Sequence, residues 1–135
     1  MLDLKLGLLV LATRLRQNWS AHATAVGLSP AQVDALLTLR PGEALPMGTL
    51  AARLDSDASN LSVLVDRLEH RGLVERRSDP DDRRVKALAL TPEGERQRVA
   101  FWHDLVEDPA PLGALSDADL ASLIQILATL GIQAD

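Results

Sequence analysis

Two clusters of polar side chains in this sequence have the types and spacing that suit contact with a nucleic acid. Arg83 and Arg84 stand side by side in SDPDDRRVKALALT, between two short runs that predict the strands of a β-hairpin. Adjacent arginines at a hairpin tip can reach the minor groove of DNA, where the potential is most negative. The second cluster, at the N-terminal end of a predicted helix, consists of Ser59, Asn60 and Ser62. Side chains at that end of a helix can reach base edges in the major groove.

Both clusters also have a plainer interpretation. The two arginines could be a solvated charge cluster at an exposed turn, and the polar residues near Asn60 could be the solvated face of a helix. Three further cations have two possible roles: they could contact phosphates, or they could simply shield the edge of a strand. They are Arg76, Arg77 and Lys86. The carboxylates of this region are expected to form the turn, because they would repel phosphate: Asp79, Asp81 and Asp82.

The residue types of this sequence give little support for catalysis or for metal binding. The sequence has no cysteine and no tyrosine, which excludes disulfides, thiolate ligands and cysteine nucleophiles. It contains neither a glycine-rich phosphate loop nor a serine in a nucleophile-elbow motif. A shared metal between His22 and His103 is conceivable, but two histidines without a nearby cysteine make a poor site. We therefore predict no enzymatic activity, no metal and no cofactor.

The charge distribution separates the middle of the chain from its ends. The chain of 135 residues has a net charge of −5, and residues 46–98 are neutral, so the flanks carry the whole imbalance. Such a pattern is compatible with DNA binding of modest non-specific affinity. The N-terminus has Asp3 where a signal peptide needs positive charge, and no apolar run is long enough to span a bilayer. We expect one cytoplasmic domain.

The order of predicted elements is helix, helix, helix-turn-helix, hairpin, helix, helix. An apolar stripe predicts the first helix over residues 3–26, and Ser29-Pro30 starts the second. A short helix over residues 47–54 and a longer one capped by Asp57 form the helix-turn-helix. The last two helices begin at Thr91-Pro92 and at Ser116. The leucine-rich terminal helices must bury against each other or against a second copy, and we expect a homodimer.

The central segment, Leu50 to Glu95, resembles the DNA-binding core of the MarR family of bacterial transcriptional regulators. The motifs that carry the resemblance are Leu50-Ala51-x-x-Leu54, Asp66-Arg67-Leu68-Glu69-x-x-Gly72-Leu73-Val74, Asp79-Pro80-x-Asp82-Arg83-Arg84 and Leu90-Thr91-Pro92-x-Gly94. The segment GLSPAQVDALLTL resembles the part that precedes this core in the family. The resemblance implies a mainly α fold with a small β-hairpin wing. It also implies a winged helix-turn-helix lobe over residues 29–91, with dimerisation helices over residues 1–28 and 92–135.

The resemblance assigns roles to individual side chains. The helix that starts at Asp57 would be the recognition helix, with five residues able to contact DNA: Ser59, Asn60, Ser62, Val63 and Arg67. One wing arginine would reach the minor groove, while Arg84 would pair with Asp66 and so orient the wing. The positions of Ala58 and Val63 often carry basic residues in the family and do not here, which predicts weaker or more sequence-dependent binding.

The resemblance also predicts a function and a ligand. The predicted function is a homodimeric transcriptional repressor that binds a pseudo-palindromic DNA operator and is released by a small aromatic or lipophilic effector. The candidate effector site is lined by Trp19, His22 and Trp102, although both tryptophans could instead be core or dimer packing. The alternative function is a winged-helix protein-interaction module that has weak or lost DNA binding, as the acidic composition would allow.

Overall fold

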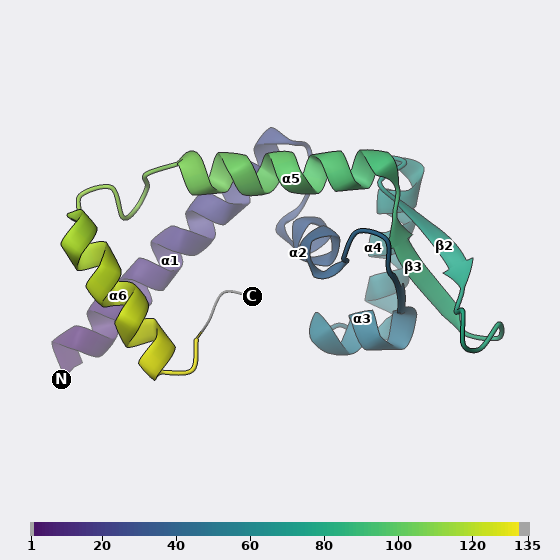
Figure 1. Ribbon diagram of the computed structural model, residues 1–135, viewed down its shortest axis with the longest axis horizontal. Helices are drawn as coiled ribbons and strands as arrows, with labels where there is room; N and C mark the ends of the chain where they lie inside the picture. Colours follow the sequence, from purple (N-terminus) through teal and green to yellow (C-terminus); the bar gives the residue numbers. More distant parts are fainter. Residues whose placement is uncertain (1, 133–135) are drawn as a thin grey trace. The chain divides into compact units, whose positions relative to one another are not determined.

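The computed structural model describes residues 2–132 of the chain. The chain forms two compact units, one made of Met1–Asn18 with Asp108–Asp135 and the other of Trp19–Glu107. We call them the terminal unit and the central unit. The helices, shown in Figure 1, are α1 (Leu2–Ala25), α2 (Pro30–Thr38), α3 (Met47–Arg53), α4 (Ala58–His70), α5 (Pro92–Glu107) and α6 (Asp117–Thr129). The strands are β1 (Ala44–Pro46), β2 (Val74–Ser78) and β3 (Lys86–Leu90).

Side-chain caps fix where several helices begin. Ser29 forms a reciprocal capping box with Gln32 at the start of α2, and Ser116 forms one with Asp119 at the start of α6. Asp57 caps α4 by accepting a hydrogen bond from the backbone N–H of Asn60 at 2.8 Å. Each cap satisfies an N–H group that the first turn of a helix leaves without an intrahelical partner. The three predicted starts are confirmed.

The helix-turn-helix forms from α3 and α4 as predicted. Asp55 in the turn between them adopts a left-handed backbone with φ of 49°, which aspartate tolerates better than most residues. The two helices turn apolar residues toward α2, so the core of the central unit is made largely of leucine and valine. Its fully buried large side chains are Val33, Leu36, Leu39, Leu50, Leu61, Val65, Leu68, Val74, Leu88 and Phe101.

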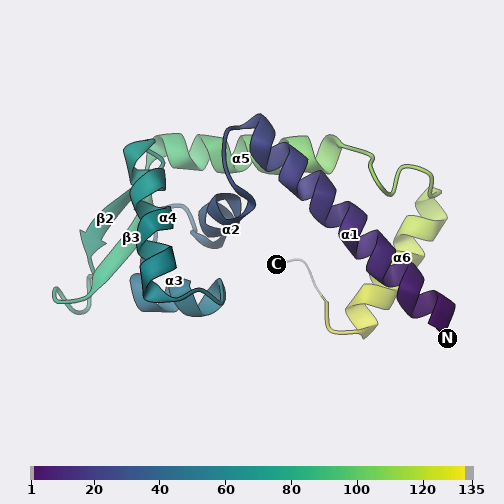
Figure 2. The ribbon, with the colours of Figure 1, turned by 180° about the vertical axis from the view of Figure 1, so that it is seen from behind.

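The wing is an antiparallel sheet in the order β1-β3-β2. The hairpin β2–β3 matches the two predicted strands, and its tip projects from the rest of the central unit in the views of Figures 1 and 2. The sequence did not predict β1, which lies where a loop was expected. This strand has only three residues, and it pairs with the edge of β3 through Leu45 opposite Leu88 and Pro46 opposite Ala87. Proline is tolerated in it because it is an edge strand.

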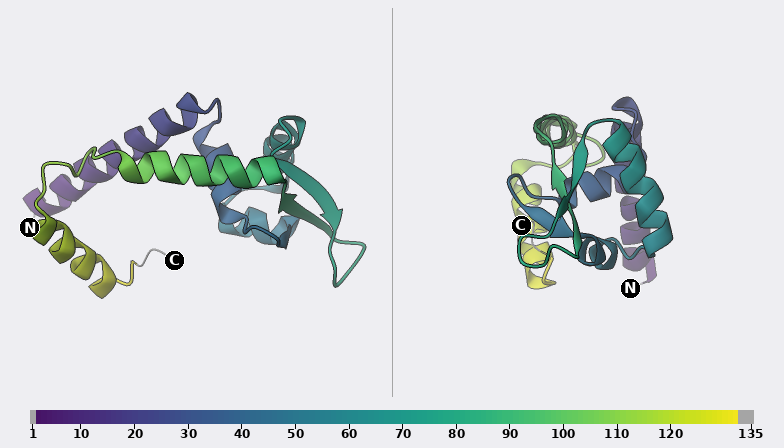
Figure 3. Two further views of the ribbon diagram at one scale, coloured as in Figure 1. Left: turned by 45° about the horizontal axis from the view of Figure 1, so that its top comes forward. Right: turned by 90° about the vertical axis from the view of Figure 1, so that its right-hand side faces the viewer.

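The Thr91-Pro92-x-Gly94 motif joins the wing to α5. The hydroxyl of Thr91 donates to the carbonyl oxygen of Gly72 at 2.5 Å and accepts from the N–H of Gly94 at 3.0 Å. A Cβ on Gly94 would stand 1.9 Å from the carbonyl oxygen of Leu73, so only glycine fits there. The motif therefore holds the first turn of α5 against the start of β2, and Figure 3 shows this junction from two further sides.

The terminal unit lacks a buried core of its own. None of the residues 3–18 and 108–132 is buried, and large apolar side chains of α1 and α6 are exposed, as in Leu9 at 65% and Ile124 at 67%. A hydrogen bond of 2.7 Å from the Asn18 amide to the Asp108 carboxylate ties the two chain segments together. Over residues 2–132, no helix is long and apolar enough to cross a membrane.

Candidate nucleic-acid interface

The outer face of α4 carries the residues that the sequence analysis selected. All five candidates, Ser59, Asn60, Ser62, Val63 and Arg67, are exposed. The opposite face of the same helix is buried through Leu61, Val65 and Leu68, with exposed fractions of 1%, 0% and 0%. Burial of that face fixes the rotation of α4 about its axis, so the polar residues must point outward. The structure thus brings the five residues together on one accessible surface.

Asn60 also supports the cap of its own helix. Its amide nitrogen donates to the Asp57 carboxylate at 2.9 Å, while its backbone N–H donates to the other carboxylate oxygen at 2.8 Å. To read an adenine in bidentate fashion, an asparagine must offer both its amide N–H and its amide oxygen. In the structure only the oxygen is uncommitted, so base reading by Asn60 requires release of the Asp57 carboxylate.

The wing is oriented by Arg76, and the predicted pairing of Arg84 with Asp66 is wrong. Asp66 of α4 instead accepts from the Arg76 guanidinium at 2.5 Å. A second contact, of 3.2 Å, joins the same guanidinium to Glu69. The hydrogen bond to Asp66 is the main cause that raises the pKa of Arg76, although partial burial opposes it. The two carboxylates, one turn apart on α4, thus hold strand β2 against this helix.

The strand register explains why Arg84 cannot take this role. Arg76 stands opposite Leu88 within the paired part of the hairpin, whereas Arg84 precedes β3 and lies beyond the last paired residues, Ser78 and Lys86. The Arg84 side chain is 91% exposed and its guanidinium contacts only the neighbouring Asp82, at 3.3 Å. The sequence signal for the true partner was the position of Arg76 inside β2, two residues after the buried Val74.

The aspartates of the wing form its turn, as predicted. The carboxylate of Asp79 accepts from the N–H groups of Asp81 and Asp82, at 2.8 and 3.3 Å, and Asp82 accepts from the N–H of Arg84 at 3.0 Å. These bonds close the loop and leave both arginines at its tip, where Arg83 is exposed as well. The wing therefore presents two cations on a turn that its own carboxylates stabilise.

The remaining predicted phosphate contacts differ in availability. Arg76 is engaged with two carboxylates, and Arg77 pairs with Glu75 of the same strand while half of its side chain stays exposed. Lys86 is exposed at the start of β3, and no ion pair involves it among residues 2–132. Of these three cations, Lys86 is thus the most available for contact with a phosphate.

Arg71 is a functional candidate that sequence reasoning missed. It caps the C-terminus of α4, and its guanidinium reaches the end of α1, donating to the carbonyl oxygens of Gly27 at 2.6 Å and Val26 at 3.1 Å. A cation there also suits the negative end of the α1 helix dipole. The only sequence signal was a basic residue directly before Gly72, which the helix C-cap alone would explain. Arg71 thus ties the end of α4 to the residues that follow α1.

The predicted effector site is only partly assembled. Trp19 packs edge-on against Phe101 with ring centroids 5.1 Å apart, and His22 meets the same ring at 6.3 Å. Phe101, which the sequence analysis did not select, is the centre of this cluster and is buried. Trp102 is its neighbour in the chain and is 51% exposed. Within residues 2–132, no group of three or more His, Cys, Asp and Glu side chains could hold a metal ion.

Comparison with known proteins gives one consistent relationship. The model of the MarR family matches residues 26–85. The HTH-type transcriptional repressor MdtR of Bacillus subtilis (strain 168) is 32% identical over 95 residues, which cover 70% of this chain and 61% of MdtR. The HTH-type transcriptional regulator YsmB of the same species is 32% identical over 112 residues, which cover 78% of this chain and 77% of YsmB. The chain thus spans less than two thirds of MdtR and more than two thirds of YsmB.

The solved structures agree in fold. A MarR family protein from Bacillus stearothermophilus is 28% identical, with a TM-score of 0.83 over 96% of this chain and 91% of that one. The mainly α fold with a small β wing, predicted from the sequence, is therefore confirmed.

Proposed function

The chain belongs to the MarR family, and we propose that it is a sequence-specific DNA-binding transcriptional regulator that represses its target as a homodimer. The observation that carries the proposal is the arrangement of α4, whose polar face is exposed while its leucines are buried. An α-helix held in this way fits the major groove of B-form DNA. The similarity of the chain to a transcriptional repressor, MdtR, and to an HTH-type transcriptional regulator, YsmB, supports the same assignment.

Base recognition falls to the N-terminal half of α4. The hydroxyls of Ser59 and Ser62 meet bases or phosphates, and the exposed methyl groups of Val63 meet a thymine methyl group. Asn60 reads an adenine once its amide leaves the Asp57 carboxylate. Arg67, further along the helix, contacts a phosphate. Because only one of these residues is a cation, specificity depends more on fit and less on charge than in a basic recognition helix.

The wing supplies the electrostatic part of binding. Arg83 and Arg84 enter the adjacent minor groove, where the negative potential attracts their guanidinium groups, and both side chains are exposed and accessible in the free protein. Arg76 fixes the angle of the wing through its two carboxylate partners on α4. Lys86 and Arg77 contact phosphates along the hairpin.

Two copies of the chain are needed for a pseudo-palindromic operator. The exposed apolar side chains of α1 and α6 supply the dimer contact, since a monomer would leave them in water. The two recognition helices then stand about one helical turn, ~34 Å, apart along the DNA. A small aromatic or lipophilic effector, bound near Trp19, His22 and Trp102, changes this separation and releases the operator.

Footprinting on the DNA upstream of the protein's own coding sequence tests the proposal, because many regulators control neighbouring genes. We expect a symmetric protected region of about two helical turns. Affinity for the protected duplex should fall steeply with salt, with a slope of about −0.9 for each phosphate neutralised. Random protection along the probe contradicts the proposal.

Alanine substitutions separate the wing contact from a general charge effect. Arg84→Ala should weaken binding to the protected duplex by about five- to tenfold and reduce the salt slope by about one unit. Arg96→Ala is the matched control, since this arginine lies at the start of α5 and pairs with Glu93 at 2.5 Å. If affinity barely depends on salt and Arg84→Ala changes nothing, the protein is a winged-helix interaction module and not a DNA-binding regulator.

A further inference from the structure

Asp57, at the start of α4, makes a contact that capping does not require. Its Oδ1 accepts from the backbone N–H of Asn60 at 2.8 Å, which is the cap itself, while its Oδ2 accepts from the Asn60 side-chain amide at 2.9 Å. In α2 the corresponding side chain, Gln32, instead accepts from the backbone N–H of Ser29 at 2.8 Å and completes a capping box. The residue at this position in α4 is thus held by the side chain of its own cap.

The contact fixes which way the Asn60 amide faces. Because the amide nitrogen is held toward the Asp57 carboxylate, the amide oxygen is turned away from it, and no hydrogen bond among residues 2–132 engages that oxygen. Asn60 is exposed, so the oxygen is open to a ligand. A base atom that accepts hydrogen bonds is disfavoured at the nitrogen, because it would also approach the negative carboxylate. Held in this way, Asn60 offers an acceptor and not a donor.

The charges around this amide favour the same kind of base. Between Asp55 and Val63 the chain has two carboxylates and no cation, and both carboxylates are exposed. Guanine presents two acceptors, N7 and O6, in the major groove, and proteins most often read it with arginine or lysine. At the start of α4 such an edge would meet negative charge and no cation. A base that presents a donor would be attracted.

Donors in the major groove are the amino groups of adenine and cytosine, whereas guanine and thymine present carbonyl oxygens. We propose that Asp57 is a specificity-determining residue: by holding the Asn60 amide, it restricts the base that Asn60 meets to adenine or cytosine. Asp57 acts through Asn60 and is therefore a positioning residue. The inference rests on the DNA-binding function proposed above and names the bases that the operator presents at one position.

The selection distinguishes the two orientations of one base pair. An amino group on the strand that Asn60 meets separates A·T from T·A and C·G from G·C. A single contact to the amide oxygen needs no release of the carboxylate. The bidentate contact to adenine, which does need that release, strengthens the preference for an amino base and does not replace it.

Base substitution in the protected duplex tests the selection. One position at a time is changed to each of the four base pairs, in both half-sites at once, and affinity is measured by fluorescence anisotropy. For the parent chain, one position should prefer adenine or cytosine over guanine and thymine by about five- to a hundredfold, the range that one mismatched pair typically costs. In Asp57→Ser this ratio should fall to within about threefold. A hydroxyl caps the backbone N–H, but it has no second oxygen to hold the amide.

Two further variants show whether the effect passes through Asn60. Asn60→Ala should lose the preference at the same position, which identifies the base that Asn60 meets. Adding Asp57→Ser to Asn60→Ala should then change the preference no further, because two residues that act through one contact are not additive. If Asp57→Ser still alters the preference in the Asn60→Ala background, Asp57 acts by another route and the proposal fails.

Asp55→Asn is the matched control for the loss of a carboxylate near the DNA. It removes a negative charge two residues away, and asparagine tolerates the left-handed backbone of this turn, whose φ is 49°. Affinity should rise for all four bases alike, because one repulsion with the phosphates is removed, and the base preference should stay. A loss of preference equal to that in Asp57→Ser would mean that charge alone sets it. Thermal unfolding of Asp57→Ser should match that of the parent to within a few degrees, since serine caps a helix about as well as aspartate.

The outcomes separate this inference from the function on which it rests. A clear base preference in the parent that Asp57→Ser leaves unchanged overturns the role of Asp57, and the DNA-binding regulator stands. A preference for guanine or thymine at the position that Asn60→Ala identifies overturns it as well. Equal affinity of the parent for every duplex overturns the sequence-specific regulator and this inference together.

Discussion

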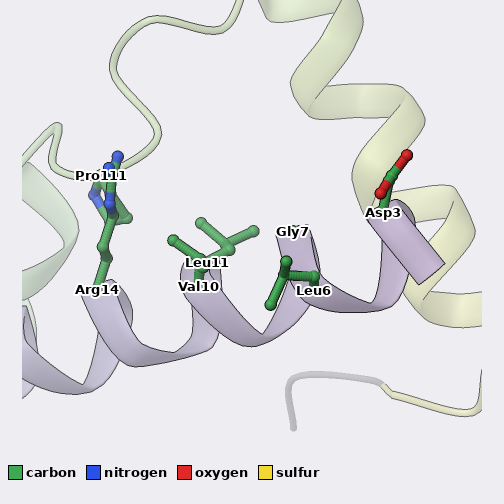
Figure 4. A pocket seen from close by; sticks show the side chains of 7 residues that line it. All are labelled: Asp3, Leu6, Gly7, Val10, Leu11, Arg14 and Pro111. Atoms are coloured by element: carbon green, nitrogen blue, oxygen red, sulfur yellow. The ribbon is translucent and has the colours of Figure 1, made fainter.

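The central and terminal units differ in where their apolar side chains lie. Every buried apolar residue of the described chain, from Ala23 to Phe101, lies in the central unit. The terminal unit has no buried residue among 3–18 and 108–132, although its helices are the richer in leucine and isoleucine. Burial of apolar surface is the main favourable term in folding. The central unit is thus complete in one chain, whereas the terminal unit leaves its apolar side chains exposed, as Leu6 and Val10 on α1 illustrate (Figure 4), and in our proposal a second copy covers them.

This difference assigns stability and assembly to different residues. Substitutions in the central core should lower the free energy of unfolding by the same amount at any protein concentration. Substitutions on α1 and α6 should act through the dimer, so that their effects depend on the protein concentration and fade when the protein is dilute enough to be monomeric.

Truncation of Phe101 should have the largest effect on stability. This ring is 1% exposed and packs against Trp19 and His22, so Phe101→Ala leaves a cavity and should cost about 3–5 kcal/mol. Urea unfolding followed by circular dichroism measures the loss. Leu9→Ala, at a position 65% exposed, should cost much less in dilute protein. Equal losses in the two variants would show that the contrast between the units is wrong.

A charge on the exposed apolar face of α6 should break the dimer and spare the fold. Ile124→Asp places a carboxylate at a position where the isoleucine is 67% exposed in one chain and would be buried in the dimer. We expect the dissociation constant of the dimer to rise about a hundredfold, which corresponds to a loss of ~2.7 kcal/mol in the free energy of association. Sedimentation velocity over a dilution series measures this change. Ser122→Asp lies on the other side of α6 and serves as the control. Loss of helical structure in Ile124→Asp at high concentration would count against this account.

The link between α4 and the end of α1 should contribute an intermediate amount. Arg71→Ala removes two hydrogen bonds from a guanidinium to backbone carbonyls and should cost about 1 kcal/mol, because the site is exposed to water. Arg71→Lys retains the charge but cannot donate to both carbonyl oxygens as the planar guanidinium does. It should therefore recover only part of the lost free energy of unfolding. Thermal unfolding of the three proteins at one concentration provides the test; full recovery in Arg71→Lys would mean that charge alone matters.

The smallest effect on stability should come from Arg76. Its ion pairs with Asp66 and Glu69 are partly exposed, so Arg76→Ala should change the free energy of unfolding by only about 0.2–1 kcal/mol. DNA affinity should nevertheless fall by more than this, because the wing loses its fixed angle to α4. Fluorescence anisotropy with the protected duplex measures the fall. An affinity that follows stability alone would remove the orienting role of Arg76.

The sequence predicted the elements whose signals are local. Ser29, Asp57 and Ser116 mark helix starts because capping depends on residues within one turn, and alternating apolar residues marked the hairpin. It missed β1, because a three-residue edge strand is stabilised by its partner and not by its own composition. The partner of Asp66 was also missed, since Arg76 and Arg84 are both wing arginines and only the register places one of them beside α4.

We propose that the α4 helices of two chains read one operator at a fixed separation. Sedimentation of the protein with the protected duplex should give two chains per duplex. Insertion of about five base pairs, half a helical turn, between the half-sites should weaken binding at least about a hundredfold, since the second helix then faces the wrong side of the DNA. One chain per duplex, or equal affinity for both duplexes, would contradict the claim.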